Sequence, residues 1–411
     1  MRPAPAAALA AGVAARAASA VRASATPPPP RLVRTVRALP SASRALALTA
    51  DGATAFVVAP LFGQVCRVRL CDGALEVPPR LWDEPAAGGD DEASGLGVRL
   101  RSLGAKAAAT PDGETVFVAG AESLEAPLYV FDGSTDCAQV GVLRVDDARG
   151  ACAVQLSADG AHLLVGGRGS VVVMDAKAAA AAARNGGEAP APRAVLRADG
   201  QLLHAAALAT SAGGALAALC GSGRWALWRD PLRPGPPDAA DRLPCGAARA
   251  LALAADGRTL VAGGSDDYRF GTHEGCLCRW ARSAGGDAHA SSAATDADAG
   301  AGAALEAWAS PPSEAAPYAP SVLLHGEVQA LAMTADGSRV FVANSRGLMA
   351  EWRPHSPDAQ PTPLEEPAED AARESWREPP QVHALALDAA GRTLVGLREA
   401  SDGAELLVWA L

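Results

Sequence analysis

A strand–turn–strand unit recurs seven times along the chain and limits its possible folds more than any other feature. The clearest copy runs from Glu327 to Arg353. It begins with alternating residues, turns at Asp336-Gly337, continues through a second apolar segment, and breaks before a third segment that ends at Trp352. Three strands in so short a stretch predict an antiparallel meander.

The seven turns share residues that favour a tight hairpin. Glycine, present in all seven, accepts left-handed backbone angles, and the aspartate that precedes it in five of them can hydrogen-bond to the backbone just ahead. The first-strand and turn segments are Arg44–Gly52, Lys106–Gly113, Ala151–Gly160, His204–Gly214, Arg249–Gly257, Gln329–Gly337 and His383–Gly391.

The later strands of each repeat are also visible. Second strands are apolar runs, as expected of strands covered on both faces. Third strands are predicted to end at Val68, Phe131, Met174, Trp228, Trp280, Trp352 and Trp409. Fourth strands are predicted over Ala74–Val77, Gln139–Val145, Arg193–Arg197 and Ser321–His325.

The seventh repeat stops after its third strand, and an unassigned strand-like segment, Arg31–Leu39, precedes the first repeat. We expect this segment to complete the last blade and close a ring, because closure removes two exposed sheet edges.

The turn Thr110-Pro111-Asp112-Gly113 and the third strands that end in tryptophan resemble the WD-repeat family across residues 31–411. Phe131-Asp132 and Met174-Asp175 stand where that family has Trp-Asp. The resemblance implies an all-β fold, a seven-bladed β-propeller of four-stranded antiparallel blades. Propellers with enzymatic roles share this meander, so the fold alone does not assign a function.

Residues 31–411 are therefore expected to form one domain. Residues 1–30 are rich in Ala and Pro and contain no acidic residue, which fits either a disordered leader or an organellar transit segment. Low-complexity insertions are expected near 178–193, read as an Ala/Pro/Gly linker, and near 283–320 and 354–380. The long gap from Gly257 to Gly337 has no further Asp-Gly hairpin with a following apolar strand, which argues against an eighth blade.

Charge and composition limit the partners. A net charge of −10 disfavours a broad nucleic-acid surface. The chain has no strongly apolar run long enough to span a membrane. Its 8 cysteines are too sparse for a disulfide scaffold. We expect a cytoplasmic or nuclear protein, with organellar import through residues 1–30 as the alternative.

Sequence signatures of common catalytic sites are absent. His273, Cys276 and Cys278 are a possible zinc set, but the two cysteines alternate along a strand and no fourth ligand is near in sequence. We expect neither a metal ion nor a cofactor.

In a propeller, the loops between second and third strands share one face with the loops that join blades. Arginine forks there suit an acidic peptide, although a solvated mixed-charge rim is the simpler interpretation. The longest loop adds aromatic residues, which fit either an interface anchor or a plug over the ring. The candidate partner-binding residues are Arg168, Arg224, Asp267, Tyr268, Arg269, Phe270, Arg346 and Arg398.

The expected function is that of a non-catalytic scaffold for protein or peptide partners, as the resemblance to WD-repeat proteins implies. The alternative is a propeller enzyme, such as a lactonase-like hydrolase, with its site in the central channel. That alternative requires inward-facing carboxylate, Asn or His side chains. The first strands are mostly Ala, Leu and Val, with His204 and His383 as exceptions, which favours the scaffold.

Overall fold

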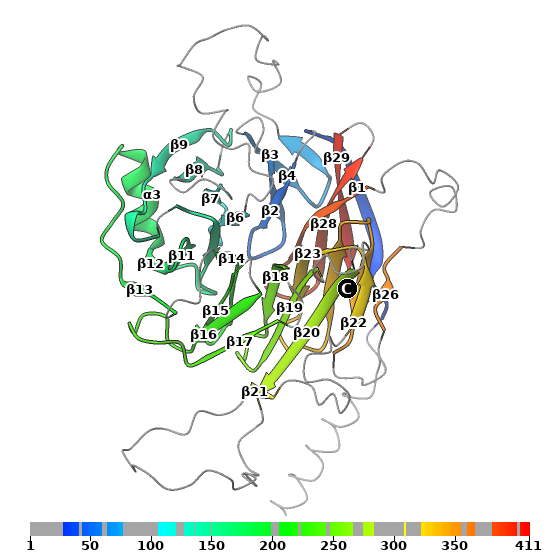
Figure 1. Cartoon of the computed structure of the whole chain (residues 1–411). Coiled ribbons are helices and arrows are strands. Elements are labelled where there is room, and N and C mark those ends of the chain that lie inside the picture. The colour runs from blue at the N-terminus through cyan, green and yellow to red at the C-terminus, as the bar shows by residue number, and fades with distance from the viewer. Residues whose placement is uncertain are drawn as a thin grey trace, which may run out of the picture.

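Seven antiparallel sheets stand around a central axis in the computed structural model of the chain (Figure 1). This arrangement confirms the predicted seven-bladed β-propeller. The structure describes residues 28–40, 43–59, 64–76, 106–120, 127–134, 136–148, 150–198, 205–220, 223–243, 247–265, 274–282, 308–309, 322–354, 360–365, 380–400 and 403–411.

The innermost strand of each blade lines the axis, and neighbouring inner strands contact one another around the whole ring. They are β2 (Ala45–Leu48), β6 (Lys106–Ala109), β10 (Ala153–Leu156), β14 (Ala205–Thr210), β18 (Ala247–Leu253), β23 (Val328–Met333) and β27 (Val382–Leu387).

The second strands are almost completely buried between neighbouring blades, as their apolar runs predicted. They are β3 (Thr54–Ala59), β7 (Thr115–Ala119), β11 (His162–Gly166), β15 (Leu216–Cys220), β19 (Thr259–Ser265), β24 (Val340–Asn344) and β28 (Thr393–Ala400).

The third strands carry the bulky residues that fill the space between blades. Each of the seven predicted end residues is buried, and Trp280 packs edge-to-face on Trp225 of the preceding blade, with 5.3 Å between ring centroids. The strands are β4 (Gln64–Arg69), β8 (Leu128–Asp132), β12 (Val171–Asp175), β16 (Arg224–Trp228), β20 (Glu274–Arg282), β25 (Met349–Trp352) and β29 (Gly403–Ala410).

Apart from β1, the outer strands are short and less regular. In the fifth blade two short strands, β21 and β22, both pair with β20, so the outer position is divided between them. The outer strands are β5 (Ala74–Glu76), β9 (Gln139–Leu143), β13 (Ala194–Leu196), β17 (Ala239–Arg242), β21 (Trp308–Ala309), β22 (Val322–His325), β26 (Thr362–Pro363) and β1 (Arg31–Leu39).

The strand β1 closes the ring as predicted. It pairs antiparallel with β29, with Leu32 opposite Trp409 and Val36 opposite Leu406. Val36 is buried against the core between the last and first blades, so the pairing adds apolar contact to backbone hydrogen bonds. The last blade therefore combines strands from the two extremes of the chain.

The seven repeat turns have the geometry that their sequence predicts. Every turn glycine has a positive φ, between 66° and 87°. In the first turn, the Asp51 carboxylate accepts a hydrogen bond of 2.9 Å from the backbone N–H of Ala53. The hydroxyl of Thr49 donates to the same carboxylate at 2.6 Å, which lowers the pKa of Asp51.

The expectation of an Ala/Pro/Gly linker near 178–193 is partly wrong. Within the segment 178–193, the structure has the helix α3 (Ala176–Arg184), capped by Asp175, whose carboxylate accepts the N–H of Ala178 at 2.9 Å. Ala179 and Ala183 are buried in the core between the second and third blades, where α3 contacts β9 as well as β12. Alanine has the highest helix propensity, and here it also covers an apolar surface.

A buried ion pair lies in the sixth blade. The carboxylate of Glu351 in β25 accepts hydrogen bonds from Nε of Arg339 at 3.0 Å and from its Nη2 at 2.9 Å. Arg339 also lies over the ring of Phe341, 5.2 Å from its centroid. Both charged side chains are buried, so each needs the opposite charge of the other to offset its loss of water.

Residues 1–27 of the expected leader, and most of the insertions near 283–320 and 354–380, lie outside the described residues. Among the residues that are described, none of the helices has the length and apolar character needed to span a bilayer.

Candidate functional site: the axial cavity and the loop face around it

A β-bulge occurs near the start of the inner strand in four blades. In β18, Ala248 pairs with Gly264 and Ala250 with Gly263, which leaves Arg249 as the extra residue. Bulges bend a strand and redirect the side chain of the extra residue. The corresponding extra residues in the other three blades are Ala206, Gln329 and His383.

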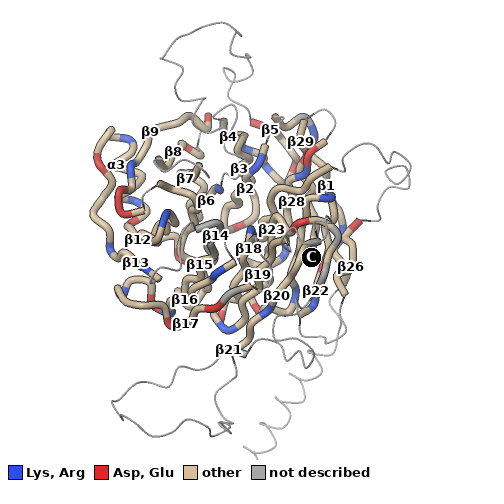
Figure 2. The backbone as a smooth tube through the Cα atoms, viewed as in Figure 1, with Lys and Arg blue, Asp and Glu red and all other residues tan. Residues whose placement is uncertain are grey.

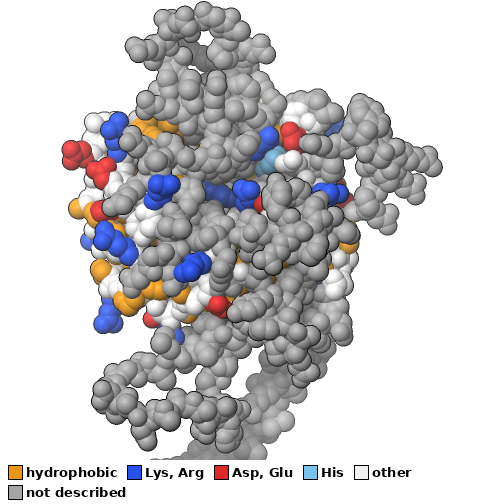
Figure 3. All heavy atoms as spheres, viewed as in Figure 1, with side chains coloured by type: hydrophobic (Ala, Val, Ile, Leu, Met, Phe, Trp, Pro, Cys, Tyr) orange, Lys and Arg blue, Asp and Glu red, His pale blue; other side chains and the backbone are white. Residues whose placement is uncertain are grey.

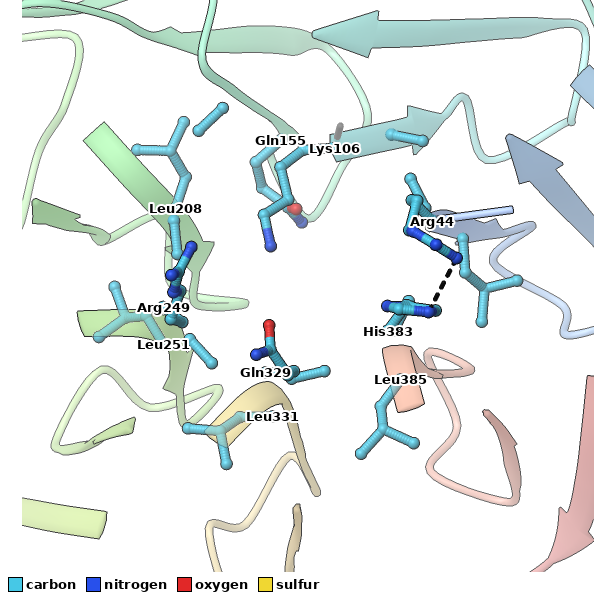
Figure 4. A pocket seen from close by; sticks show the side chains of 18 of the residues that line it. Arg44, Lys106, Gln155, Leu208, Arg249, Leu251, Gln329, Leu331, His383 and Leu385 are labelled. Atoms are coloured by element: carbon cyan, nitrogen blue, oxygen red, sulfur yellow. Dashed lines mark hydrogen bonds between the residues drawn. The ribbon is translucent and has the colours of Figure 1, made fainter. Parts of the chain in front are cut away.

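A cavity of about 160 Å³ lies on the axis and is lined by the inner strands of all seven blades (Figure 4). Most lining residues are Ala, Leu or Val, as expected, but the exceptions include more than His383, and His204 lies outside the described residues. The polar side chains of the lining are Arg44, Lys106, Gln155, Arg249, Gln329 and His383.

The cavity and the turns between second and third strands share one face of the ring. The cavity's polar residues stand mostly at the start of inner strands, opposite the Asp-Gly hairpins. In the sixth blade, the backbone N–H of Ser345, in one such turn, donates to the carbonyl of Glu327 beside β23 at 2.8 Å. Figure 2 shows basic residues beside the inner strands as well as on outer turns, and in Figure 3 basic side chains and a histidine reach the surface of this view near the axis.

On one side of the cavity, Arg44 and His383 form a pair. Nη1 of Arg44 donates to Nε2 of His383 at 2.9 Å, the contact dashed in Figure 4. Burial, and then the positive charge of Arg44, lower the pKa of His383 to about 4. The imidazole is therefore neutral near pH 7, with its proton on Nδ1. Glu399 lies 3.7 Å from Arg44, and its side chain is 41% exposed.

On the opposite side, a carboxylate organises two lining residues. Oε1 of Glu327 accepts from Nε of Arg249 at 2.8 Å, and its Oε2 accepts from the amide of Gln329 at 3.0 Å. The hydroxyl of Ser265 adds a longer contact of 3.3 Å to Oε1. Glu327 thus holds Arg249 through Nε, and the two terminal nitrogens of Arg249 make no hydrogen bond to a described residue.

Lys106 has a different environment from the two arginines. It makes no hydrogen bond or ion pair with the residues that the structure describes, and Figure 4 shows it and Gln155 pointing into the cavity. Burial, and then the charge of Arg249, lower the pKa of Lys106. An ammonium group in this position has lost part of its water without gaining a carboxylate partner among the described residues.

The structure separates the sequence-predicted arginines into two groups. Arg168, Arg224 and Arg346 are exposed and form no ion pair with any described residue. Arg168 and Arg346 lie in turns, whereas Arg224 is the first residue of β16. Arg398 is not in a loop but in β28, where it pairs with Glu405 at 2.8 Å and with Glu365 at 2.9 Å.

The remaining predicted residues, Asp267, Tyr268, Arg269 and Phe270, fall on a segment outside the described residues. The zinc hypothesis gains no support, because Cys276 is disulfide-bonded whereas Cys278 is free and buried. A disulfide sulfur cannot serve as a thiolate ligand. Across the described ranges, no group of three or more His, Cys, Asp or Glu side chains is placed to hold a metal ion.

Most of the cavity's polar residues were missed by sequence reasoning, which singled out only His383 among them. Arg44, Arg249, Gln329 and His383 each stand eight positions before the turn glycine of their repeat. Aligning the repeats on that glycine reveals a column of polar residues, and this column was the available signal.

Comparison with known proteins adds no family assignment: no family model matches the chain, and no curated protein matches it. What is established is therefore the seven-bladed propeller and the geometry of its axial face.

Proposed function

We propose that the protein is a non-catalytic protein-interaction scaffold of the WD-repeat type. The observation that carries this proposal is the set of three exposed arginines, Arg168, Arg224 and Arg346, which three different blades present on one face. None forms an ion pair with a described residue, so a partner's carboxylate can engage them without displacing any carboxylate in the described part of the chain.

The scaffold supports this use of the face. Turns between buried strands are held at both ends, so their arginines keep a fixed spacing on the ring. An acidic peptide or protein surface could then contact several blades at once, and planar guanidinium groups suit bidentate contacts with carboxylates. The proposed partners are proteins or peptides in the cytoplasm or nucleus.

Charge reversal on the two faces tests this proposal. The variant Arg224→Glu with Arg346→Glu changes the proposed face. The matched control, Arg258→Glu with Arg392→Glu, makes the same charge change at exposed positions on the opposite Asp-Gly hairpins. Proximity labelling of the tagged chain in its own cell should lose its enriched proteins with the first variant and keep them with the second. Equal labelling profiles for both variants would refute the proposed face.

The alternative function is a propeller enzyme with a lactonase-like hydrolase site in the channel. The cavity gives this alternative a location, and His383 supplies one inward-facing candidate, although Arg44 already engages its Nε2. Hydrolysis of a lactone and ester panel by the full chain, abolished by His383→Gln, would favour the enzyme over the scaffold.

A further inference from the structure

We propose that the axial cavity is a binding site for a small oxyanion, a carboxylate or phosphate group, held by Lys106, Arg249 and Gln155. This inference goes beyond the scaffold function and does not depend on it, because it concerns a free ligand in the channel rather than a partner on the surface.

The balance of charge favours an anion. Three basic side chains line the cavity, and His383 between them is neutral near pH 7. Glu327 pairs closely with Arg249, whereas Glu399 is 3.7 Å from Arg44 and is itself partly exposed. Lys106 has no carboxylate partner among the described residues. A cation held away from water is stabilised when an anion binds beside it.

The donors also converge. Lys106, the terminal nitrogens of Arg249 and the Gln155 amide come from three different blades and border one space (Figure 4). Both carboxylate oxygens of Glu327 are already engaged, by Arg249 and by Gln329. The described lining thus offers more hydrogen-bond donors than acceptors, which suits an oxyanion.

The size of the cavity sets a limit on the ligand. Its volume is about 160 Å³. An engineered apolar cavity of about 150 Å³ in another protein accommodates benzene, a molecule of six heavy atoms. Inorganic phosphate and malonate are of similar size, so either can enter as a whole, whereas a nucleotide cannot.

The pKa of Lys106 supports the same conclusion. Burial and the charge of Arg249 lower it, so these surroundings disfavour the ammonium form. A bound oxyanion has the opposite effect on this pKa and favours the charged form. Binding of the oxyanion and protonation of Lys106 should therefore support each other.

Calorimetric titration of the full chain with inorganic phosphate, and separately with malonate, tests the site. Ionic strength is kept constant with chloride, and the two ligands distinguish a phosphate site from a carboxylate site. We expect saturable binding of at least one of them. Lys106→Met, which keeps an unbranched apolar chain but removes the ammonium group, should weaken that binding about tenfold or more, because a charged hydrogen-bond donor is lost.

Two further variants make the result specific. Gln155→Leu should also weaken binding, by a smaller factor because the amide is neutral. Arg224→Met, which removes one positive charge from the same face outside the cavity, should leave the affinity within about twofold. The proposal fails if neither anion binds saturably, if Lys106→Met binds as the natural chain does, or if Arg224→Met weakens binding as much as Lys106→Met. Circular dichroism establishes that each variant is folded.

Discussion

Arg44 donates a hydrogen bond to His383 across the junction between the first and last blades, with Nη1 and Nε2 2.9 Å apart. The two residues are 339 positions apart in sequence. Arginine remains charged at all physiological pH values, so Nε2 of His383 must accept and cannot carry a proton while the bond exists. This contact across the junction of the first and last blades therefore forms only while the His383 imidazole is neutral.

The stability of the ring should consequently decrease in acid. Burial, and then Arg44, lower the pKa of His383 from 6.5 to about 4. Between these values the unfolded chain takes up a proton that the folded chain does not. Stability is thus highest above pH 6.5 and falls toward pH 4, by at most about 3 kcal/mol from this residue. The neighbouring Glu399 carboxylate reduces the effect.

Urea unfolding as a function of pH measures this contribution. The variant His383→Gln keeps an acceptor for Arg44 but has no ionisable group. As the pH is lowered from 7 to 4, the unfolding free energy of the natural chain should fall relative to that of this variant. A difference that stays constant from pH 7 to pH 4 would show that His383 titrates normally.

The buried pair of Arg339 and Glu351 should be sensitive to the removal of one charge. Glu351→Gln leaves the Arg339 guanidinium buried without a counter-ion, so we expect a loss of about 3 kcal/mol or more. Replacing both residues, by Arg339→Met with Glu351→Leu, should recover much of that loss. Arg353 also donates to Glu351, at 2.7 Å, but its side chain is 36% exposed. Arg353→Met should cost less than about 1 kcal/mol in the same urea measurement.

Two turn glycines should respond differently to alanine. Gly160 and Gly214 have similar positive φ values, 70° and 87°. A Cβ on Gly160 would lie 2.4 Å from Cγ of Pro111 in the preceding blade, whereas a Cβ on Gly214 would meet no atom within 4 Å. Gly214→Ala should cost about 1 kcal/mol from backbone strain alone. Gly160→Ala should cost about 1–3 kcal/mol more, because it also overpacks the contact between blades.

Removal of β1 should open the ring. A chain without residues 1–39 exposes the edge of β29 and its apolar partners. We expect this chain to self-associate, because an unpaired edge strand is a template for pairing. A chain without residues 1–27 keeps β1 and serves as the control. Size-exclusion chromatography with light scattering distinguishes the two, and a monomeric, fully folded chain without β1 would contradict the closure.

The sequence predicted those parts of the fold that depend on local chemistry. Turn residues such as Asp112-Gly113 and apolar second strands such as β24 determine their own conformation. The sequences of the outer strands determine their conformation only weakly. β17 has the sequence AADR and β26 contains a proline, so neither has an alternating or apolar pattern, and both exist because β16 and β25 offer an edge.

The candidate site was less predictable for a different reason. In a regular strand, successive side chains alternate between the two faces of the sheet. Without a bulge, Arg249 and His383 would each point to one of these faces. The bulges add one residue and redirect both side chains toward the axis. A bulge arises from pairing with the neighbouring strand, which no single segment of sequence reveals. The helix α3 was missed because alanine is frequent throughout the chain.

The pairing of β1 with β29 also sets a time order during protein synthesis. β1 leaves the ribosome before all other described strands, and its partner is the last of them to emerge. For most of translation, β1 has no native partner, and the six other blades can assemble without it. Completion of the circle therefore has to wait for β29, the last of the described strands.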